Sequence, residues 1–364
     1  MKIIISGGGT GGHIFPAIAI ANTLMEQNPD NEILFVGAEG RMEMEKVPAA
    51  GYKIKGLPIQ GLKRKLSSEN VKLVFKLMKS LKMARAIVSD FKPDVVVGVG
   101  GYASGPVLRV AAKMGIPTLI QEQNSYAGIT NKILGKKASK ICVAYENMER
   151  FFPKEKIVLT GNPIRNNLLN KDITREEALK HFGLQPDKKI ILSVGGSLGA
   201  GTINESIISH LGVISKFDAQ LLWQTGQYYY KNAKEKYDEV NPQNVVVTDF
   251  IKRMDLAYKI ADVVISRAGA ISISELCLLE KPTIFVPSPN VSEDHQTKNA
   301  LALSTKNAAI LIADKDAEKN LINEALKLIN DNEKMSLLSK NISKFAKNNS
   351  AELIANEIIN LQKV

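Results

Sequence analysis

The chain opens with Lys2-Ile3-Ile4-Ile5-Ser6-Gly7-Gly8-Gly9-Thr10-Gly11-Gly12, in which a short apolar run passes directly into a loop of glycines. The β-branched run predicts a buried strand, and the residues after the glycines predict a helix. Gly7, Gly9 and Gly12 have the G-x-G-x-x-G spacing of dinucleotide-binding loops, which hold a phosphate at a helix N-terminus. A tight strand-to-helix turn without a ligand has the same pattern. We therefore predict a Rossmann-like unit here and leave its ligand open.

The same alternation of apolar runs and helical segments continues along the whole chain. Predicted strands lie at 2–5, 33–36, 94–97, 117–120, 140–143 and 157–159, and then at 190–194, 219–223, 244–247, 262–265, 283–286 and 309–312. Such alternation is typical of parallel sheets covered by helices. The sequence predicts an α/β fold with two doubly wound parallel-sheet domains.

The boundary between the two domains is predicted at Gly161-Asn162-Pro163, where a strand ends in turn residues. We expect an N-terminal domain at 1–161 and a C-terminal domain at 162–346. Two helices are predicted at 333–347 and 351–362, with Ser350 as N-cap of the second. The last segment, 347–364, has an apolar stripe and is expected to pack back on the first domain.

Composition limits the classes of function. The 364 residues predict more than one domain, and 48 Lys and Arg against 37 Asp and Glu give a net charge of +11, which favours an anionic partner. The two cysteines, Cys142 and Cys277, form no metal-binding or disulfide pattern and suit a reducing compartment. The first residues lack the apolar region of a signal peptide, and no apolar run is long enough for a spanning helix. We expect a protein that is not exported.

Seven motifs occur in order along both predicted domains. They are GGGTGGHIFP at 7–16, GGYASGP at 100–106, QEQN at 121–124, GNPIR at 161–165, GGSLGA at 195–200, SRAGAISISE at 266–275 and EDHQTKNA at 293–300. With these motifs the chain resembles the MurG family of bacterial peptidoglycan glycosyltransferases. It departs from the family pattern at Leu198 and at His295, where relatives often carry Gln.

The resemblance implies a GT-B fold, in which two Rossmann-like domains face each other across a cleft and the C-terminal domain holds most of the donor. It implies an inverting enzyme that moves N-acetylglucosamine (GlcNAc) from UDP-GlcNAc to the C4 hydroxyl of N-acetylmuramic acid (MurNAc) in lipid I, forming lipid II. No cofactor is expected. The implied location is the cytoplasmic face of the bacterial cell membrane, as a peripheral protein.

Two residues compete for the role of general base. His13 follows the first glycine loop at the opening of a helix, and an imidazole changes its protonation near neutral pH. Glu122 follows the strand at 117–120 and is expected in the same crevice. A structural histidine and a solvated strand end are the alternatives. Tyr102 is expected to line the acceptor pocket or to pack on its own loop.

The donor contacts implied by the resemblance come from both domains. Glu275 is assigned to ribose, Ile251 to uracil, and His295 and Gln296 to sugar hydroxyls, although plain core is the alternative for Ile251. The full set is Thr10, Gly11, Gly12, Asn124, Arg165, Ser197, Ile251, Ala270, Ile271, Ser272, Glu275, His295 and Gln296.

Phosphate chemistry is expected from two of these residues. The Arg165 guanidinium presents paired donors that suit a diphosphate, with an interdomain ion pair as the alternative. Ser197 lies in the second glycine loop at a predicted helix N-terminus, which stabilises charge on the departing UDP. The string Asp314-Lys315-Asp316 matches a metal-binding Asp-x-Asp, but its place before a long helix favours capping, so no catalytic metal is predicted.

The segment 53–85 is rich in Lys and Arg and holds a single acid, Glu69. A helical projection of 71–88 puts Leu73, Val74, Leu77, Met78, Leu81 and Val88 on the inward arc. The predicted contacts with an anionic phospholipid surface are Val71, Lys72, Phe75, Lys76, Lys79 and Lys82. An ordinary amphipathic helix with a solvated lysine face is the alternative, and nucleic acid is not expected as a partner.

Three other functions stay open at the level of sequence. The first glycine loop also suits an NAD-dependent oxidoreductase, and a nucleotide-sugar epimerase would have the same fold. A membrane-associated scaffold that binds a nucleotide sugar without catalysis is the third.

Overall fold

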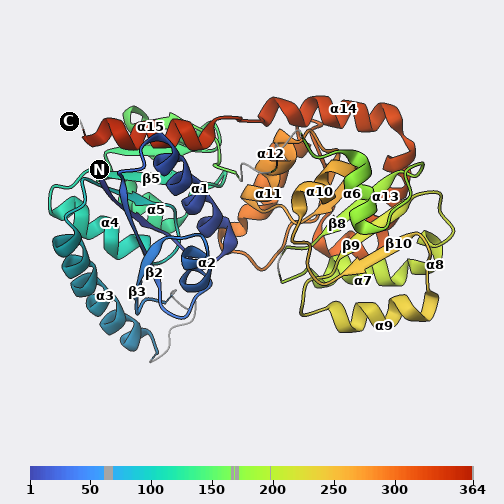
Figure 1. Cartoon of the computed structure of the whole chain (residues 1–364), viewed down its shortest axis with the longest axis horizontal. Coiled ribbons are helices and arrows are strands. Elements are labelled where there is room, and N and C mark those ends of the chain that lie inside the picture. Colours follow the sequence, from blue (N-terminus) through green and yellow to red (C-terminus); the bar gives the residue numbers. More distant parts are fainter. Residues whose placement is uncertain (61–68, 165–167, 169–171, 197, 363–364) are drawn as a thin grey trace. The chain divides into compact units, whose positions relative to one another are not determined.

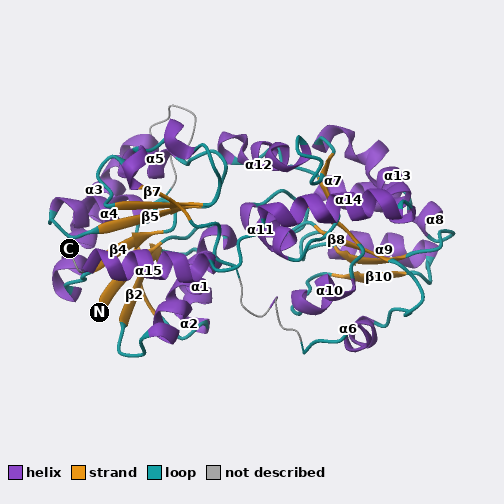
Figure 2. Cartoon of the chain, turned by 90° about the horizontal axis from the view of Figure 1, so that it is seen from above, coloured by secondary structure: helices purple, strands orange, loops and turns teal. Residues whose placement is uncertain are grey.

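The computed structural model divides into two compact units, Met1–Arg165 with Lys347–Val364, and Asn166–Ala346 (Figure 1). It describes residues 1–60, 69–164, 168, 172–196 and 198–362, with only the backbone described at 69–74 and at Ser292. The predicted fold class is confirmed, because each unit is a doubly wound parallel sheet between helices (Figure 2).

The sheet of unit 1 has the strand order β3-β2-β1-β4-β5-β6-β7, with all neighbours parallel. Its strands are β1 (Lys2–Ser6), β2 (Glu32–Ala38), β3 (Lys53–Leu57), β4 (Val95–Gly98), β5 (Thr118–Glu122), β6 (Lys140–Val143) and β7 (Ile157–Leu159). Its helices are α1 (Gly11–Gln27), α2 (Glu43–Ala49), α3 (Glu69–Phe91), α4 (Ser104–Lys113), α5 (Ile129–Gly135) and α15 (Ser350–Gln362).

Alternate residues of the strands in unit 1 build two cores. Ile4 of β1 faces the side chains of α3 and α4, whereas Ile3 and Ile5 face those of α1 and α15. The chain's last helix lies beside α1, as both ribbon views show. Ile354 and Ile358 of α15 are fully buried there, so this helix is a structural part of unit 1. Ser350 begins α15, and its hydroxyl donates to Lys347 O instead of capping the helix.

The sheet of unit 2 has the strand order β10-β9-β8-β11-β12-β13 and is also parallel throughout. Its strands are β8 (Ile190–Val194), β9 (Gln220–Gln224), β10 (Val245–Thr248), β11 (Val263–Ser266), β12 (Thr283–Phe285) and β13 (Ile310–Leu311). Its helices are α6 (Arg175–Phe182), α7 (Gly201–Ser209), α8 (Leu211–Ile214), α9 (Tyr230–Val240), α10 (Met254–Ile260), α11 (Ala270–Leu278), α12 (His295–Ser304), α13 (Ala317–Asn330) and α14 (Asn332–Ile342). Helices α7 and α13 cover one core, in which Trp223 is fully buried.

The inward arc predicted for α3 is wrong at Leu77 and Met78, and the side chains of Leu73 and Val74 lie outside the described residues. Leu77 and Met78 are 42% and 62% exposed, and the buried residues of the described part of α3 are Ser80, Ala84, Ile87 and Val88. The reason is length, because α3 has 23 residues and α4, against which it packs, has 10. The turn of α3 that holds Leu77 and Met78 is therefore exposed in the described part of the chain. Within the described residues, no helix has the length and apolar character that crossing a membrane requires.

Candidate functional site

The carboxyl ends of β1, β4 and β5 are neighbours in unit 1. The chain leaves β1 toward β2 on one side, whereas β4 lies on its other side, so the strand order reverses at β1. Ligands of doubly wound folds bind in the crevice at such a reversal. The loops after β1 and β4 hold the first two predicted glycine motifs, and Gln121 to Asn124 span the end of β5 and the start of the loop that follows it.

Two of these loops touch through glycines. A Cβ on Gly101, whose φ is +85°, would overlap the backbone oxygen of Gly8. A Cβ on Gly8 would in turn overlap the carboxylate of Glu43, which accepts hydrogen bonds from Gly9 N at 2.9 Å and Ala38 N at 2.9 Å. Glu43 lies in α2 and is 1% exposed. It holds the first glycine loop in place, a role that the sequence analysis missed.

His13 lies in the first turn of α1, directly behind this loop. Thr10 is the N-cap with extended φ and ψ, and its side chain makes no capping hydrogen bond. The His13 ring lies against the second glycine loop, because a Cβ on Gly100 would be 2.7 Å from its Cε1. The Nδ1 atom is 3.2 Å from Oε1 of Gln123. The structure therefore brings His13, the glycines of both loops and the end of β5 together.

Glu122 is buried in a saturated hydrogen-bond network. Its Oε1 accepts from the backbone N and the Nδ2 of Asn124 at 3.1 and 3.2 Å, and its Oε2 accepts from Gly128 N at 3.0 Å and Asn131 Nδ2 at 2.8 Å. The residue is 1% exposed. A carboxylate offers about four acceptor sites, and all four are used here. This geometry favours Glu122 as the organiser of the loop after β5, and favours His13 as the base.

The remaining predicted residues of unit 1 lie around these loops. Tyr102 is 51% exposed in the second glycine loop, and Thr10 is exposed at the start of α1. Gly11 and Gly12 are the first residues of α1. Their ligand contacts, like that of Asn124, stay predictions.

Unit 2 repeats the arrangement at the carboxyl ends of β8, β9 and β11. A Cβ on Gly226 would overlap the backbone of Gly199, so the loop after β9 packs tightly on the glycine loop that follows β8. Ile251 is 3% exposed, and its N donates to Gln224 Oε1 at 3.2 Å. The Nε2 atom of Gln224 donates to Gly196 O at 2.9 Å. Ile251 is thus fixed beside the glycine loop through its backbone.

Helix α11 begins shortly after β11, and no side chain at its N-cap forms a hydrogen bond to its first backbone N–H groups. Its N-cap is Gly269, and no acidic residue lies in its first turn, which contains Ala270, Ile271 and Ser272. Glu275 is one turn further and 2% exposed, and its Oε2 accepts a hydrogen bond from Tyr258 OH at 3.2 Å. Gln296, at the start of α12, accepts from Ser288 N at 2.8 Å, and His295 precedes it as the first residue of the helix.

The Asp-x-Asp string has a structural role that differs from the predicted capping. Asp314 pairs with Arg267 and accepts a hydrogen bond from Thr202 Oγ1 at 2.9 Å, which ties the loop after β11 to α7. Asp316 is the N-cap of α13 but makes no capping hydrogen bond through its side chain.

Several predicted residues lie outside what the structure describes. Arg165 and Ser197 are among these, and of Val71 and Lys72 only the backbone of α3 is described. In the described part of the predicted membrane face, Phe75 is 74% exposed, Lys79 and Lys82 are exposed, and Lys76 is half-buried. Lys76 donates to Gln60 Oε1 at 2.9 Å.

Comparisons with known proteins decide the family. The profile of the glycosyltransferase family 28 N-terminal domain matches residues 3–143, and that of the glycosyltransferase family 28 C-terminal domain matches residues 190–358. The chain belongs to glycosyltransferase family 28. The first matched region lies within unit 1, and the second covers most of unit 2 and continues into α15 of unit 1.

Individual relatives of this family 28 chain cover its whole length. It is 62% identical, over 99% of its length and 98% of the relative's, to the UDP-N-acetylglucosamine--N-acetylmuramyl-(pentapeptide) pyrophosphoryl-undecaprenol N-acetylglucosamine transferase of Parabacteroides distasonis. Among solved structures it resembles Acinetobacter baumannii MurG, with a TM-score of 0.78 and 29% identity over 99% of both chains. The UDP-GlcNAc 2-epimerase from Neisseria meningitidis shares the fold, with a TM-score of 0.71, 16% identity, and 99% and 100% of the two chains covered.

Proposed function

We propose that this chain is an inverting hexosyltransferase that transfers GlcNAc from UDP-GlcNAc to the C4 hydroxyl of MurNAc in lipid I, which yields lipid II for peptidoglycan synthesis. The observation that carries the proposal is the 62% identity over 99% of the chain to a relative named for this transfer. The glycine loops at the carboxyl ends of the central strands of both units support it, since each loop offers backbone N–H groups to a phosphate.

The donor is assigned mainly to unit 2. The open N-terminus of α11 and the tightly packed glycine loop suit the diphosphate, and the backbone of Ile251 beside that loop suits an edge of uracil. Glu275 is assigned to the ribose hydroxyls, because a buried carboxylate accepts strong hydrogen bonds. Unit 1 is assigned to the acceptor.

The reaction is a single displacement at the anomeric carbon of GlcNAc. The C4 oxygen of the acceptor forms the new bond, the bond from the anomeric carbon to the phosphate oxygen breaks, and UDP leaves with the electron pair. We assign the hydroxyl proton to His13, which follows the first glycine loop of unit 1 and whose ring lies against the second. Backbone N–H groups at the helix N-termini stabilise the charge that develops on UDP, so the residues of this chain need no metal for that task.

Lipid I is the acceptor, and its polyprenyl tail stays in the bilayer, so unit 1 has to reach a lipid surface. The start of α3 suits this contact, because Phe75 and Met78 are 74% and 62% exposed beside exposed lysines. Apolar groups enter the interface while ammonium groups attract anionic headgroups. We place the protein peripherally at the cytoplasmic face of the bacterial cell membrane.

UDP release tests the function against its nearest rival. With UDP-GlcNAc and a soluble lipid I analogue, UDP should appear only when both substrates are present. Conversion of UDP-GlcNAc to its C2 epimer without acceptor would instead identify an epimerase. UDP release that ignores the acceptor would contradict both.

A further inference from the structure

A series of hydrogen-bonded, buried amide side chains connects His13 to Asn162, which lies just after β7. Gln123 Nε2 donates to Val99 O at 2.7 Å and also to Gln121 Oε1. Gln121 Nε2 donates to Asn162 Oδ1 at 2.9 Å, and Asn162 Nδ2 donates to the backbone oxygen of Gln123 at 3.0 Å. The three amides are between 0% and 2% exposed. These amides lie within the motifs QEQN and GNPIR, and no local sequence pattern indicates a role for them.

Two backbone carbonyls fix the orientation of all three amide side chains in this series. A carbonyl oxygen only accepts, so the atom of Gln123 that faces Val99 O is its NH2 group. For the same reason the atom of Asn162 that faces the oxygen of Gln123 is its NH2 group. Gln121 lies between them and satisfies both neighbours in only one orientation. A flip of any amide would place two donors or two acceptors together.

The orientation of Gln123 determines which nitrogen of His13 carries the proton. With its NH2 group committed, Gln123 presents Oε1 to the imidazole, and the atom 3.2 Å away is Nδ1. An oxygen that only accepts requires Nδ1 to carry the proton. In a neutral imidazole the lone pair then resides on Nε2.

We propose that Gln123 is a positioning residue that holds His13 in the tautomer with the proton on Nδ1, so that Nε2 is the atom that takes the proton from the acceptor hydroxyl. This inference rests on the proposed function, in which His13 is the base. After proton transfer the imidazolium carries a proton on each nitrogen, and Gln123 Oε1 still accepts from Nδ1. The ring therefore need not turn during the reaction.

Nitrogen-15 NMR reads the tautomer without any assay of activity. The chain has four histidines, so a spectrum of selectively labelled protein is simple, and a His13→Gln variant assigns the signals. His210 is an internal reference, because its Nδ1 faces the backbone oxygen of Ser206 at 2.9 Å and must also be protonated. At a pH that keeps the rings neutral, His13 should match His210. A proton on Nε2 of His13 would overturn the proposal.

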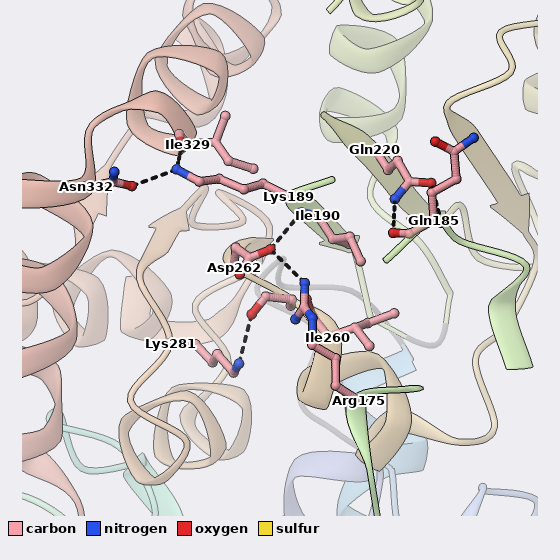
Figure 3. A network of polar contacts seen from close by, with 11 residues as sticks. Arg175, Gln185, Lys189, Ile190, Gln220, Ile260, Asp262, Lys281, Ile329 and Asn332 are labelled. Atoms are coloured by element: carbon pink, nitrogen blue, oxygen red, sulfur yellow. Dashed lines mark hydrogen bonds and ion pairs between the residues drawn. The ribbon is translucent and has the colours of Figure 1, made fainter. Parts of the chain in front are cut away.

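Kinetics of a matched pair of variants test the positioning role. Gln123→Met removes the acceptor, so the His13 signals should shift toward a tautomer mixture, with kcat lower by about 10²-fold and the KM for UDP-GlcNAc unchanged. The control is Gln220→Met in unit 2, where a buried glutamine exchanges two hydrogen bonds with Gln185 at the amino end of β9 (Figure 3). This control should lose stability but keep kcat.

Three outcomes would overturn the proposal, and they differ in meaning. Equal loss of kcat in both variants would mean that any buried amide matters equally. Wild-type kcat in Gln123→Met, with His13→Ala inactive, would leave the base in place and remove only the positioning role. Normal turnover in His13→Ala would overturn the base assignment of the proposed function itself.

Discussion

At the residue scale, Glu275 gives the sharpest test of the donor assignment. Glu275→Ala should weaken UDP-GlcNAc binding by about 10- to 100-fold, because a hydrogen bond to a charged group contributes roughly 1.5–3 kcal/mol. Tyr258→Phe is the control, since it removes the hydroxyl that donates to Glu275 Oε2 and keeps the carboxylate. Calorimetry checks both variants. Unchanged affinity in Glu275→Ala, or equal loss in the two variants, would contradict the ribose assignment.

A second residue, Lys281, predicts how the stability of unit 2 depends on pH. Burial lowers the pKa of Lys281 to about 8 from 10.5, although its Nζ donates to Ala261 O at 2.8 Å (Figure 3). The folded state thus binds this proton less firmly than the unfolded chain. Below pH 8 the buried ammonium group destabilises the folded state by its full amount. As the pH rises from 8 to 10.5 this destabilisation disappears, and the free energy of unfolding increases by roughly 1.4 kcal/mol per unit of pKa shift.

Lys281→Met removes the titrating group and its penalty. Relative to the wild type, the variant should gain most stability at pH 7 and least near pH 10.5. Trp223, the only tryptophan, is fully buried in unit 2, so its fluorescence follows denaturant unfolding of that unit. A constant difference between the two proteins across this pH range would contradict the prediction.

Sequence patterns located the polar end of β5 but not the roles of its residues. Glu122 and Asn124 were selected because they follow a buried strand. Side chains alternate along a strand, so Gln121 and Gln123 belong to its other face, where they reach Asn162 and His13. The partners of these amides are far away in sequence, and no local pattern reveals them. Glu43 was missed for the same reason, since its contact with Gly9 spans 34 positions.

At the scale of elements, α3 tests the membrane contact. Replacement of Lys72, Lys76, Lys79 and Lys82 by Ser should reduce binding to anionic vesicles, and salt should have a similar effect because exposed charges are screened over about 8 Å. Donor binding should survive. The control is replacement of Lys231, Lys234 and Lys236 by Ser on α9, an exposed helix of unit 2. If sedimentation shows that the α3 substitutions leave vesicle binding unchanged, or that both sets of substitutions reduce it equally, α3 is not the membrane contact.

Elements with one strong pattern were predicted well, and those with a mixed pattern were not. The buried central strands are continuous apolar runs and were all found. Strand β3 was missed, because it alternates lysine with apolar residues at the edge of the sheet. Leu77 and Met78 of α3 were misassigned to the buried face, because a helical projection contains no information about how far a neighbouring helix extends.

At the scale of the whole molecule, the two cysteines report on the two units separately. Cys142 lies in unit 1 and Cys277 in unit 2, and burial raises the pKa of each thiol to about 12. Labelling therefore requires local opening or unfolding. UDP-GlcNAc at about 100 times its Kd should slow labelling of Cys277 by about 100-fold and leave Cys142 nearly unchanged. Mass spectrometry of peptides checks this, and protection of Cys142 alone would assign the donor to unit 1.

Inverting transfer of GlcNAc to lipid I determines the structure of the product, so the linkage in the product distinguishes this reaction from any other. The product of UDP-GlcNAc and a lipid I analogue should be isolated and its linkage determined by NMR. We expect a β-linked GlcNAc on the C4 oxygen of MurNAc, because one displacement inverts the α-configuration of the donor. An α-linked product, or transfer to a different hydroxyl, would contradict it.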